Sequence, residues 1–169
     1  MNEIENLGCN TYGMNLYAGK ITPNKNHSVS IFLIVEHTDD KDIIYKEALQ
    51  MLDAFGQSNF HFYGKQEPLW HFAFDEIDSQ LNIEKNFSNT IGYETLEEFV
   101  DELQDERHMH TIIPSDYYLI YDDREIYNKV KQTYLYPQTK LKNPNLFNWL
   151  FLIHRQNLKP QFINWAKQI

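Results

Sequence analysis

A strongly apolar, β-branched segment stands early in the chain, SVSIFLIVEH from Ser28 to His37. Because it shows almost no polar alternation, it predicts a central strand that is buried on both faces. A helix is expected to follow it to about residue 55, with Asp39 or Asp40 as the N-cap and Gly56 at its end. Its apolar positions recur at helical spacing and predict one buried face: Ile43, Ile44, Ala48, Met51, Leu52 and Phe55.

Two segments of alternating character, residues 59–63 and 69–77, flank the turn-forming sequence GKQEP. Their period of two predicts an antiparallel hairpin. In such a hairpin His61 and His71 lie on paired strands and can face each other. Residues 81–87 are expected to add a third strand. The second strand of the hairpin places its larger aromatic side chains on one face: Trp70, Phe72 and Phe74.

The segment from Thr95 to Arg107 has the clearest helical pattern, and turn-forming residues at 89–92 predict a loop before it. Thr95 and Glu98 form a capping box. In that motif the threonine hydroxyl accepts a hydrogen bond from the Glu98 amide, and the Glu98 carboxylate accepts one from the Thr95 amide. The apolar stripe of this helix is expected to face the core: Leu96, Phe99, Val100 and Leu103.

The last part of the chain predicts one strand and three helices. Residues 117–121 are apolar and aromatic enough for a strand, and Asp122 can cap a short helix that reaches about residue 134. Residues 146–154 and 161–169 are expected to form two final helices. Strands and helices in mixed order, with a hairpin, predict an α+β fold. We therefore expect one domain over residues 1–169, with a mixed or antiparallel sheet, a central hairpin, helices packed on it and a helical C-terminus.

Charge is distributed unevenly along the chain. The protein has 15 basic and 24 acidic residues and a net charge of −9. Residues 1–126 contain eight of the basic and all 24 acidic residues, whereas residues 127–169 contain seven basic and no acidic ones. Such an asymmetry can mark an interaction surface. The alternative is that the basic C-terminal part packs against the acidic part and neutralises some of it.

The helix predicted over residues 95–107 is the most acidic part of the chain. A solvated helix usually places Lys or Arg four residues from its acids, but eleven acidic residues face two basic ones between Tyr93 and Glu125. Carboxylates near the end of a helix also oppose its dipole. This cost predicts a surface complementary to a basic partner, the alternative being a face that only keeps the protein in solution. The predicted partner-binding residues are Glu97, Glu98, Asp101, Glu102, Asp105, Glu106, Asp122 and Asp123.

Motifs for a metal, a cofactor or a nucleophile are weak. Cys9 is the only cysteine, which excludes an intrachain disulfide and a thiolate-rich zinc site. His108 and His110 make a short His-x-His pair near acids, but the chain has no HExxH, Walker A, GxGxxG or GxSxG pattern. We therefore expect no metal, no cofactor and no catalytic residue. The alternative is a small hydrolase or nuclease in which His61 and His71 act as acid and base.

The start of the chain, MNEIENLGCN, carries acids where a signal peptide needs basic residues. The longest nearly continuous apolar run, residues 146–153, is far short of the about 20 residues that a membrane span needs. These features predict a cytoplasmic protein without a membrane partner. Basic residues interleave with aromatic ones in the C-terminal part, as in proteins that bind single-stranded nucleic acid, but the net negative charge opposes direct nucleic-acid binding.

The function that fits these observations is a small acidic protein-binding module. It is expected to neutralise or regulate a basic partner protein, such as a toxin or a nucleic-acid-binding enzyme. Bacterial immunity proteins and phage-encoded inhibitors that mimic nucleic acid share this composition. Beside the hydrolase or nuclease alternative, a third possibility is a structural subunit whose aromatic surface is covered by self-association.

Overall fold

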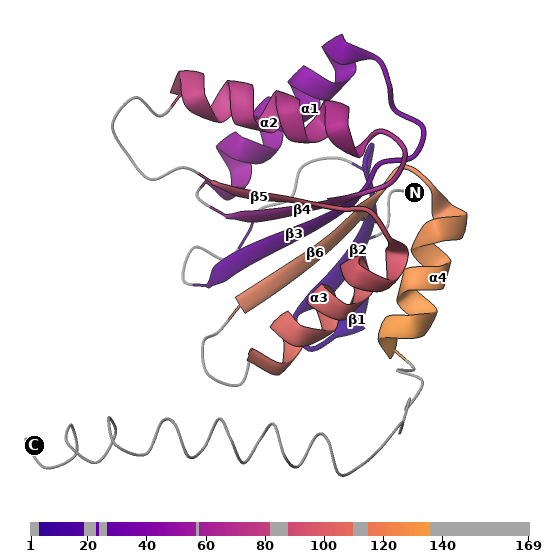
Figure 1. Ribbon diagram of the computed structural model, residues 1–169. Coiled ribbons are helices and arrows are strands. Elements are labelled where there is room, and N and C mark those ends of the chain that lie inside the picture. The colour runs from indigo at the N-terminus through magenta and orange to yellow at the C-terminus, as the bar shows by residue number, and fades with distance from the viewer. Residues whose placement is uncertain are drawn as a thin grey trace, which may run out of the picture. The chain divides into compact units, whose positions relative to one another are not determined.

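A mixed six-stranded sheet forms the centre of the protein in the computed structural model (Figure 1). The strand order is β1-β2-β6-β3-β4-β5. β1 pairs with β2 in antiparallel fashion, and every other pairing is parallel. The α+β class expected from the sequence is confirmed. The strands are β1 (Glu5–Gly8), β2 (Thr11–Asn15), β3 (Ser28–Ile34), β4 (Asn59–Tyr63), β5 (Asn89–Tyr93) and β6 (Ser115–Tyr121).

Helices cover both faces of this sheet. The chain runs from β3 outward through β4 to β5 and then returns to the other side of β3 as β6. This reversal places the helices of the outward run on one face and the remaining two on the other, as in doubly wound sheets (Figure 1). The helices are α1 (Lys41–Phe55) and α2 (Glu67–Leu81) on the first face, and α3 (Leu96–Met109) and α4 (Arg124–Leu135) on the second.

The structure describes residues 4–18, 23, 27–56, 58–81, 88–109 and 115–135, without the side chains of Leu81 and of residues 107–109. All of these lie in a unit that spans residues 1–137. The two helices predicted over residues 146–154 and 161–169 lie outside the described residues. The expectation of a single domain over residues 1–169 therefore stays a prediction. None of the helices described is long and apolar enough to cross a membrane.

The central strand and the helix after it match the sequence prediction. β3 is buried from Ser30 onward because both faces of the sheet are covered by helices. Asp40 is the N-cap of α1, and its carboxylate accepts hydrogen bonds from the amides of the two residues at positions 42 and 43. Gly56 ends the helix with a φ of 61°, where its amide donates to the carbonyl of Leu52.

The predicted central hairpin is wrong, because residues 69–77 belong to helix α2. The aromatic alternation at Trp70, Phe72 and Phe74 suggested a strand, but Phe72 is 65% exposed and faces away from the other two. The buried positions instead follow helical spacing, and Pro68 stands in the first turn, where proline is tolerated. The side chains that α2 buries are Trp70, Ala73, Phe74, Ile77 and Asp78.

An antiparallel hairpin does exist, but at the opposite edge of the sheet, where β1 meets β2. Its turn consists of Cys9 and Asn10, which have φ angles of 50° and 55°. Two consecutive residues with positive φ form the turn that matches the twist of paired strands. Cysteine is an unusual residue for this conformation, so the turn carried no clear signal in the sequence.

Two further sequence predictions are corrected around β5. The turn-forming residues at 89–92 lie in this edge strand, since pairing with β4 gives the short segment its partner. Leu81 is the last residue of α2, and residues 82–87 lie outside the described residues, so the third strand expected over 81–87 does not begin there. β6 covers the strand predicted over residues 117–121.

Candidate functional site

The acidic helix begins as its sequence predicts. The amide of Glu98 donates to the Thr95 hydroxyl at 3.2 Å, and the amide of Thr95 donates to the Glu98 carboxylate at 3.3 Å. The predicted apolar stripe faces the sheet: Phe99, Val100 and Leu103 are buried, and Leu96 packs against the same cluster. With that stripe held against the core, the opposite face of α3 must carry its acids outward.

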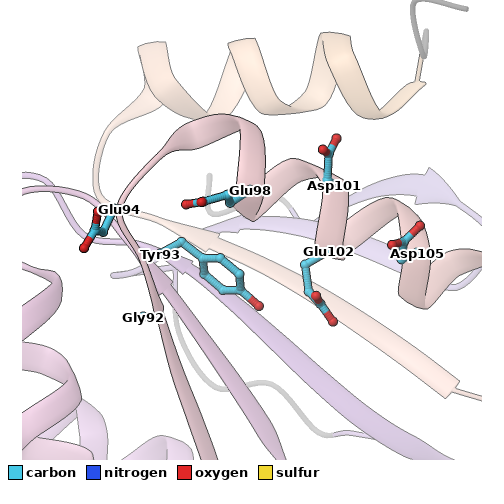
Figure 2. Close-up of a pocket in the computed structure, with 7 residues that line it drawn as sticks. All are labelled: Gly92, Tyr93, Glu94, Glu98, Asp101, Glu102 and Asp105. Carbon is cyan, nitrogen blue, oxygen red and sulfur yellow. The ribbon is translucent and has the colours of Figure 1, made fainter. Parts of the chain in front are cut away.

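A shallow concavity of about 500 Å³ lies between this acidic face and the end of β5 (Figure 2). Four of the predicted partner-binding residues line it together with three residues of β5 and its continuation. None of the seven lining residues is basic, so the concavity concentrates negative potential. The lining residues are Gly92, Tyr93, Glu94, Glu98, Asp101, Glu102 and Asp105.

Tyr93 lines the concavity and contacts the buried core through its hydroxyl. Its hydroxyl lies 2.8 Å from Nδ1 of His61, which is only 1% exposed and stacks on Phe32 at a ring distance of 4.2 Å. Burial raises the pKa of the Tyr93 hydroxyl, and the nearby carboxylates of Glu102 and Glu106 raise it further. Tyr93 therefore stays a neutral phenol, and the negative charge of the concavity comes from carboxylates alone.

Glu97 and Glu106 do not line the concavity. Glu97 is exposed on the solvent side of α3. Glu106 has an 18% exposed side chain, and its Oε1 lies 3.2 Å from Nε2 of His61. Nε2 is a buried atom without a hydrogen bond in the described residues. The contact between Glu106 and His61 is therefore an electrostatic one.

Asp122 and Asp123 lie away from the concavity, at the carboxyl ends of β3 and β6. Strand order reverses at this point, and doubly wound sheets commonly bind ligands there. Here the crevice is spanned by the protein's own contacts, because the Asp122 carboxylate accepts four hydrogen bonds of 2.8–3.0 Å. The donors belong to the loop after β3 and are the amides of Glu36, His37 and Thr38 and the Thr38 hydroxyl.

Asp123, and not Asp122, caps α4. Its Oδ1 accepts the amide of Ile126 at 2.8 Å, and its Oδ2 lies 2.7 Å from Nε2 of His37. The bond from the Ile126 amide is the main reason that the pKa of the Asp123 carboxyl lies below its usual value, and His37 adds to the effect. Both aspartates are thus engaged with the protein itself, which separates them from the acids of α3.

Part of the basic C-terminal segment lies on α4 and pairs locally with acids. Lys129 Nζ is 2.8 Å from a carboxylate oxygen of Glu125, and Lys131 pairs with Glu5 of β1. Lys131 and Tyr127 both donate to that Glu5 carboxylate, which lowers its pKa. One of the two alternatives drawn from the sequence was that the basic part, residues 127–169, neutralises some of the acidic part. The pair of Lys131 and Glu5 is one such contact, and residues 136–169 lie outside the described residues.

The histidines of the enzyme alternative do not converge. His61 points toward α3 and stacks between Phe32 and Tyr93, whereas His71 stacks on Phe62 of the opposite sheet face. On that face Nδ1 of His71 lies 3.1 Å from the Glu67 carboxylate, and Nε2 lies 3.1 Å from the Thr90 hydroxyl. The sheet itself separates the two imidazoles, because the hairpin that was to pair them does not form.

We expect His61→Ala and His71→Ala to lower the free energy of unfolding independently of each other. The two side chains share no partner and lie on opposite sheet faces, so their effects should add to within about 0.5 kcal/mol. Urea denaturation of the two single variants and the double variant measures this. A hydrolase or nuclease activity that both single variants lose while remaining folded would contradict the separation.

The structure offers no alternative metal centre within the residues it describes, where no group of three or more His, Cys, Asp or Glu side chains is arranged to hold an ion. His108 belongs to α3 but its side chain is not described, and His110 lies outside the described residues. The expectation that this His-x-His pair holds no metal therefore stays a prediction.

Gly92, Tyr93 and Glu94 line the concavity but were not among the predicted partner-binding residues. Residues 89–92 suggested only a loop, although Thr90 and Ile91 are β-branched and fit an edge strand. In comparisons with family models, with curated proteins and with solved structures, nothing matched this chain.

Proposed function

We propose that the protein is a binding module that neutralises or regulates a basic partner protein through the acidic face of α3. The observation that carries this proposal is the joint lining of one concavity by Glu98, Asp101, Glu102 and Asp105 without a basic residue among its walls. We call this concavity, whose acidic lining consists of these four residues and Glu94, the acidic concavity. The type of action that its composition suggests is that of an immunity protein or an inhibitor.

The arrangement of these acids favours a partner over simple solvation. Their mutual repulsion is not relieved by basic neighbours in the lining, and Asp105, near the C-terminal end of α3, also opposes the helix dipole. A basic protein that covers the face relieves both costs at once. Complementary fields of this kind raise the association rate and the selectivity of a complex more than its affinity.

The enzyme alternative receives less support from the same structure. A shared acid and base require two titratable groups within reach of one substrate, and His61 and His71 lie on opposite faces of the sheet. The crevice at the strand-order reversal is bridged by Asp122 and the loop it binds. Protein binding is therefore the function that these contacts favour.

Charge reversal at Asp101 and Asp105 tests the proposal. Both residues are exposed, and neither takes part in the capping box. In the double variant Asp101→Lys, Asp105→Lys we expect association with the partner at low ionic strength to slow by about tenfold or more, because the steering field is reduced. The measurement is the association rate against salt concentration, with the basic protein identified by cross-linking to the wild-type chain in its native host.

The matched control reverses the same amount of charge on another part of the molecule. Asp39 and Asp53 are exposed residues near the two ends of α1, on the opposite side of the sheet. At each salt concentration, the association rate of the variant Asp39→Lys, Asp53→Lys should stay within about twofold of the wild-type rate. Equal slowing in the two double variants would mean that only net charge matters, and the acidic concavity would then not be the binding surface.

A further inference from the structure

The edge strand β5 exposes backbone groups beside the acidic concavity. Within the described residues β5 pairs only with β4. In a parallel strand the amide and carbonyl of one residue point to the same neighbour, and successive residues alternate. The Asn89 amide donates to the carbonyl of Ser58. The backbone amides and carbonyls of Asn89, Ile91 and Tyr93 therefore point toward β4. The amides and carbonyls of Thr90 and Gly92 must therefore point outward.

Acidic side chains flank this edge on both faces of the sheet. On the α3 side, Gly92 and Tyr93 themselves line the acidic concavity. On the α2 side, the Thr90 hydroxyl donates to Asp75 at 2.7 Å, and a β-carbon added to Gly92 would collide with the Glu67 carboxylate. An extended chain laid against β5 would consequently meet carboxylates above and below its backbone.

The spacing of the acids suits side chains that alternate along a strand. Glu98, Glu102 and Asp105 succeed one another at about one helical turn, which corresponds to about 5.4 Å. Every second side chain of a strand recurs at about 6.6 Å on one face. Basic residues at alternate positions of an added strand can thus each reach a different carboxylate of α3.

We propose that β5 receives an extended, lysine- or arginine-rich segment of the partner as an added strand. The outward groups of Thr90 and Gly92 form backbone hydrogen bonds with that segment, and its alternate basic side chains pair with the acidic concavity. Strand addition of this kind takes affinity from the backbone and selectivity from the side chains. The inference rests on the proposed function, because it specifies which part of a basic protein the acidic concavity binds.

A synthetic peptide of eight residues, alternating lysine and threonine with blocked ends, serves as the probe. When it binds the full-length protein, the amide hydrogens of Thr90 and Gly92 should exchange with solvent at least about tenfold more slowly. The amide of Ile91 points toward β4 and serves as the internal control, so its exchange should stay nearly unchanged. NMR-detected hydrogen exchange with and without the peptide measures all three positions. Unchanged exchange at Thr90 and Gly92 under saturating peptide would overturn strand addition.

Backbone methylation separates strand pairing from charge attraction. In an added strand all lysine amides point one way and all threonine amides the other. Of two peptides methylated at two lysine nitrogens or at two threonine nitrogens, one should bind about tenfold or more weakly and the other nearly as well as the parent. Titration by fluorescence anisotropy measures both dissociation constants. Equal affinities of the two methylated peptides would contradict the pairing.

A pair of protein variants examines the same hydrogen bonds from the side of β5. Thr90→Val and Thr90→Pro both remove the hydroxyl that bonds Asp75, but only proline removes the outward amide. Proline should weaken peptide binding by about threefold to tenfold relative to valine. If the proline variant does not fold, the methylated peptides decide the question with the wild-type protein.

The outcomes distinguish the inference from the proposed function. If Asp101→Lys, Asp105→Lys weakens peptide binding while methylation and amide exchange reveal no pairing, the acidic concavity binds basic chains without strand addition, and the inference alone fails. If that double variant binds the peptide as tightly as the wild type does, both fail. Differential methylation together with protection of Thr90 and Gly92 supports both.

Discussion

Asp122→Ala is expected to lower the free energy of unfolding by about 3 kcal/mol or more. The Asp122 carboxylate accepts four hydrogen bonds, three of them from consecutive backbone amides of residues 36–38. Within the part of the chain that the structure describes, Asp122 is the acceptor of these three amides, and a charged acceptor contributes about 1.5–3 kcal/mol per bond. The loop joins β3 to α1, so the loss of these hydrogen bonds also loosens the start of that helix.

Urea denaturation of the full chain, followed by circular dichroism, measures the effect. Asp122→Asn is the matched control, because the amide keeps the shape and one acceptor oxygen but loses the charge. Its free energy of unfolding should fall between those of the wild type and the alanine variant. A change of less than about 0.5 kcal/mol in Asp122→Ala, the size typical of an ordinary surface position, would show that water replaces the carboxylate without loss.

Trp70→Ala is expected to cost about 3–5 kcal/mol of stability, as large aromatic deletions in cores do. Trp70 is 0% exposed and packs with Phe74 in the cluster between α1, α2 and the sheet. Its indole N–H donates to the carbonyl of Thr38 at 3.2 Å. The substitution therefore leaves both a cavity and a buried carbonyl without its donor.

Trp70→Phe separates these two contributions, since phenylalanine keeps most of the ring volume and removes the donor. Its loss should be about 1–3 kcal/mol, the cost of one buried group left unsatisfied. Trp70 and Asp122 both bind Thr38, the former at its carbonyl and the latter at its amide and hydroxyl. The double variant Trp70→Ala, Asp122→Ala should therefore lose less stability than the sum of the two single variants. Strict additivity of the two losses would contradict the role of Thr38 as the shared element.

The apolar pattern of β3 and the caps of two helices were readable from the sequence. Asp40 and the Thr95–Glu98 capping box act through residues two or three positions away, so local chemistry alone determines them. The apolar stripe of α3 followed from helical periodicity, and with it the outward direction of the acids. For the same reason four of the eight predicted partner-binding residues line one concavity.

The sequence failed where one local pattern was compatible with two structures. Alternating aromatic residues at 70, 72 and 74 fit a strand, but burial of Trp70, Ala73, Phe74 and Ile77 against the sheet selected a helix. β5 is short and contains turn-forming residues, and it becomes a strand only by pairing with β4. In both cases the free energy that decides the conformation comes from residues distant in the sequence, so no local pattern contains it.

The positions of the acidic residues were likewise determined partly by the sequence and partly by the tertiary structure, for the same physical reason. The sequence alone determined that α3 carries its acids on one solvent-facing side, because charge and helical period are local properties. Only the tertiary structure decided that Asp122 and Asp123 also bind the loop after β3, that Glu106 lies against His61, and that Gly92 and Tyr93 complete the concavity. The contacts of the two aspartates with the loop after β3, and of Glu106 with His61, join residues about 45 to 86 positions apart, and the order of strands in the sheet brings them together.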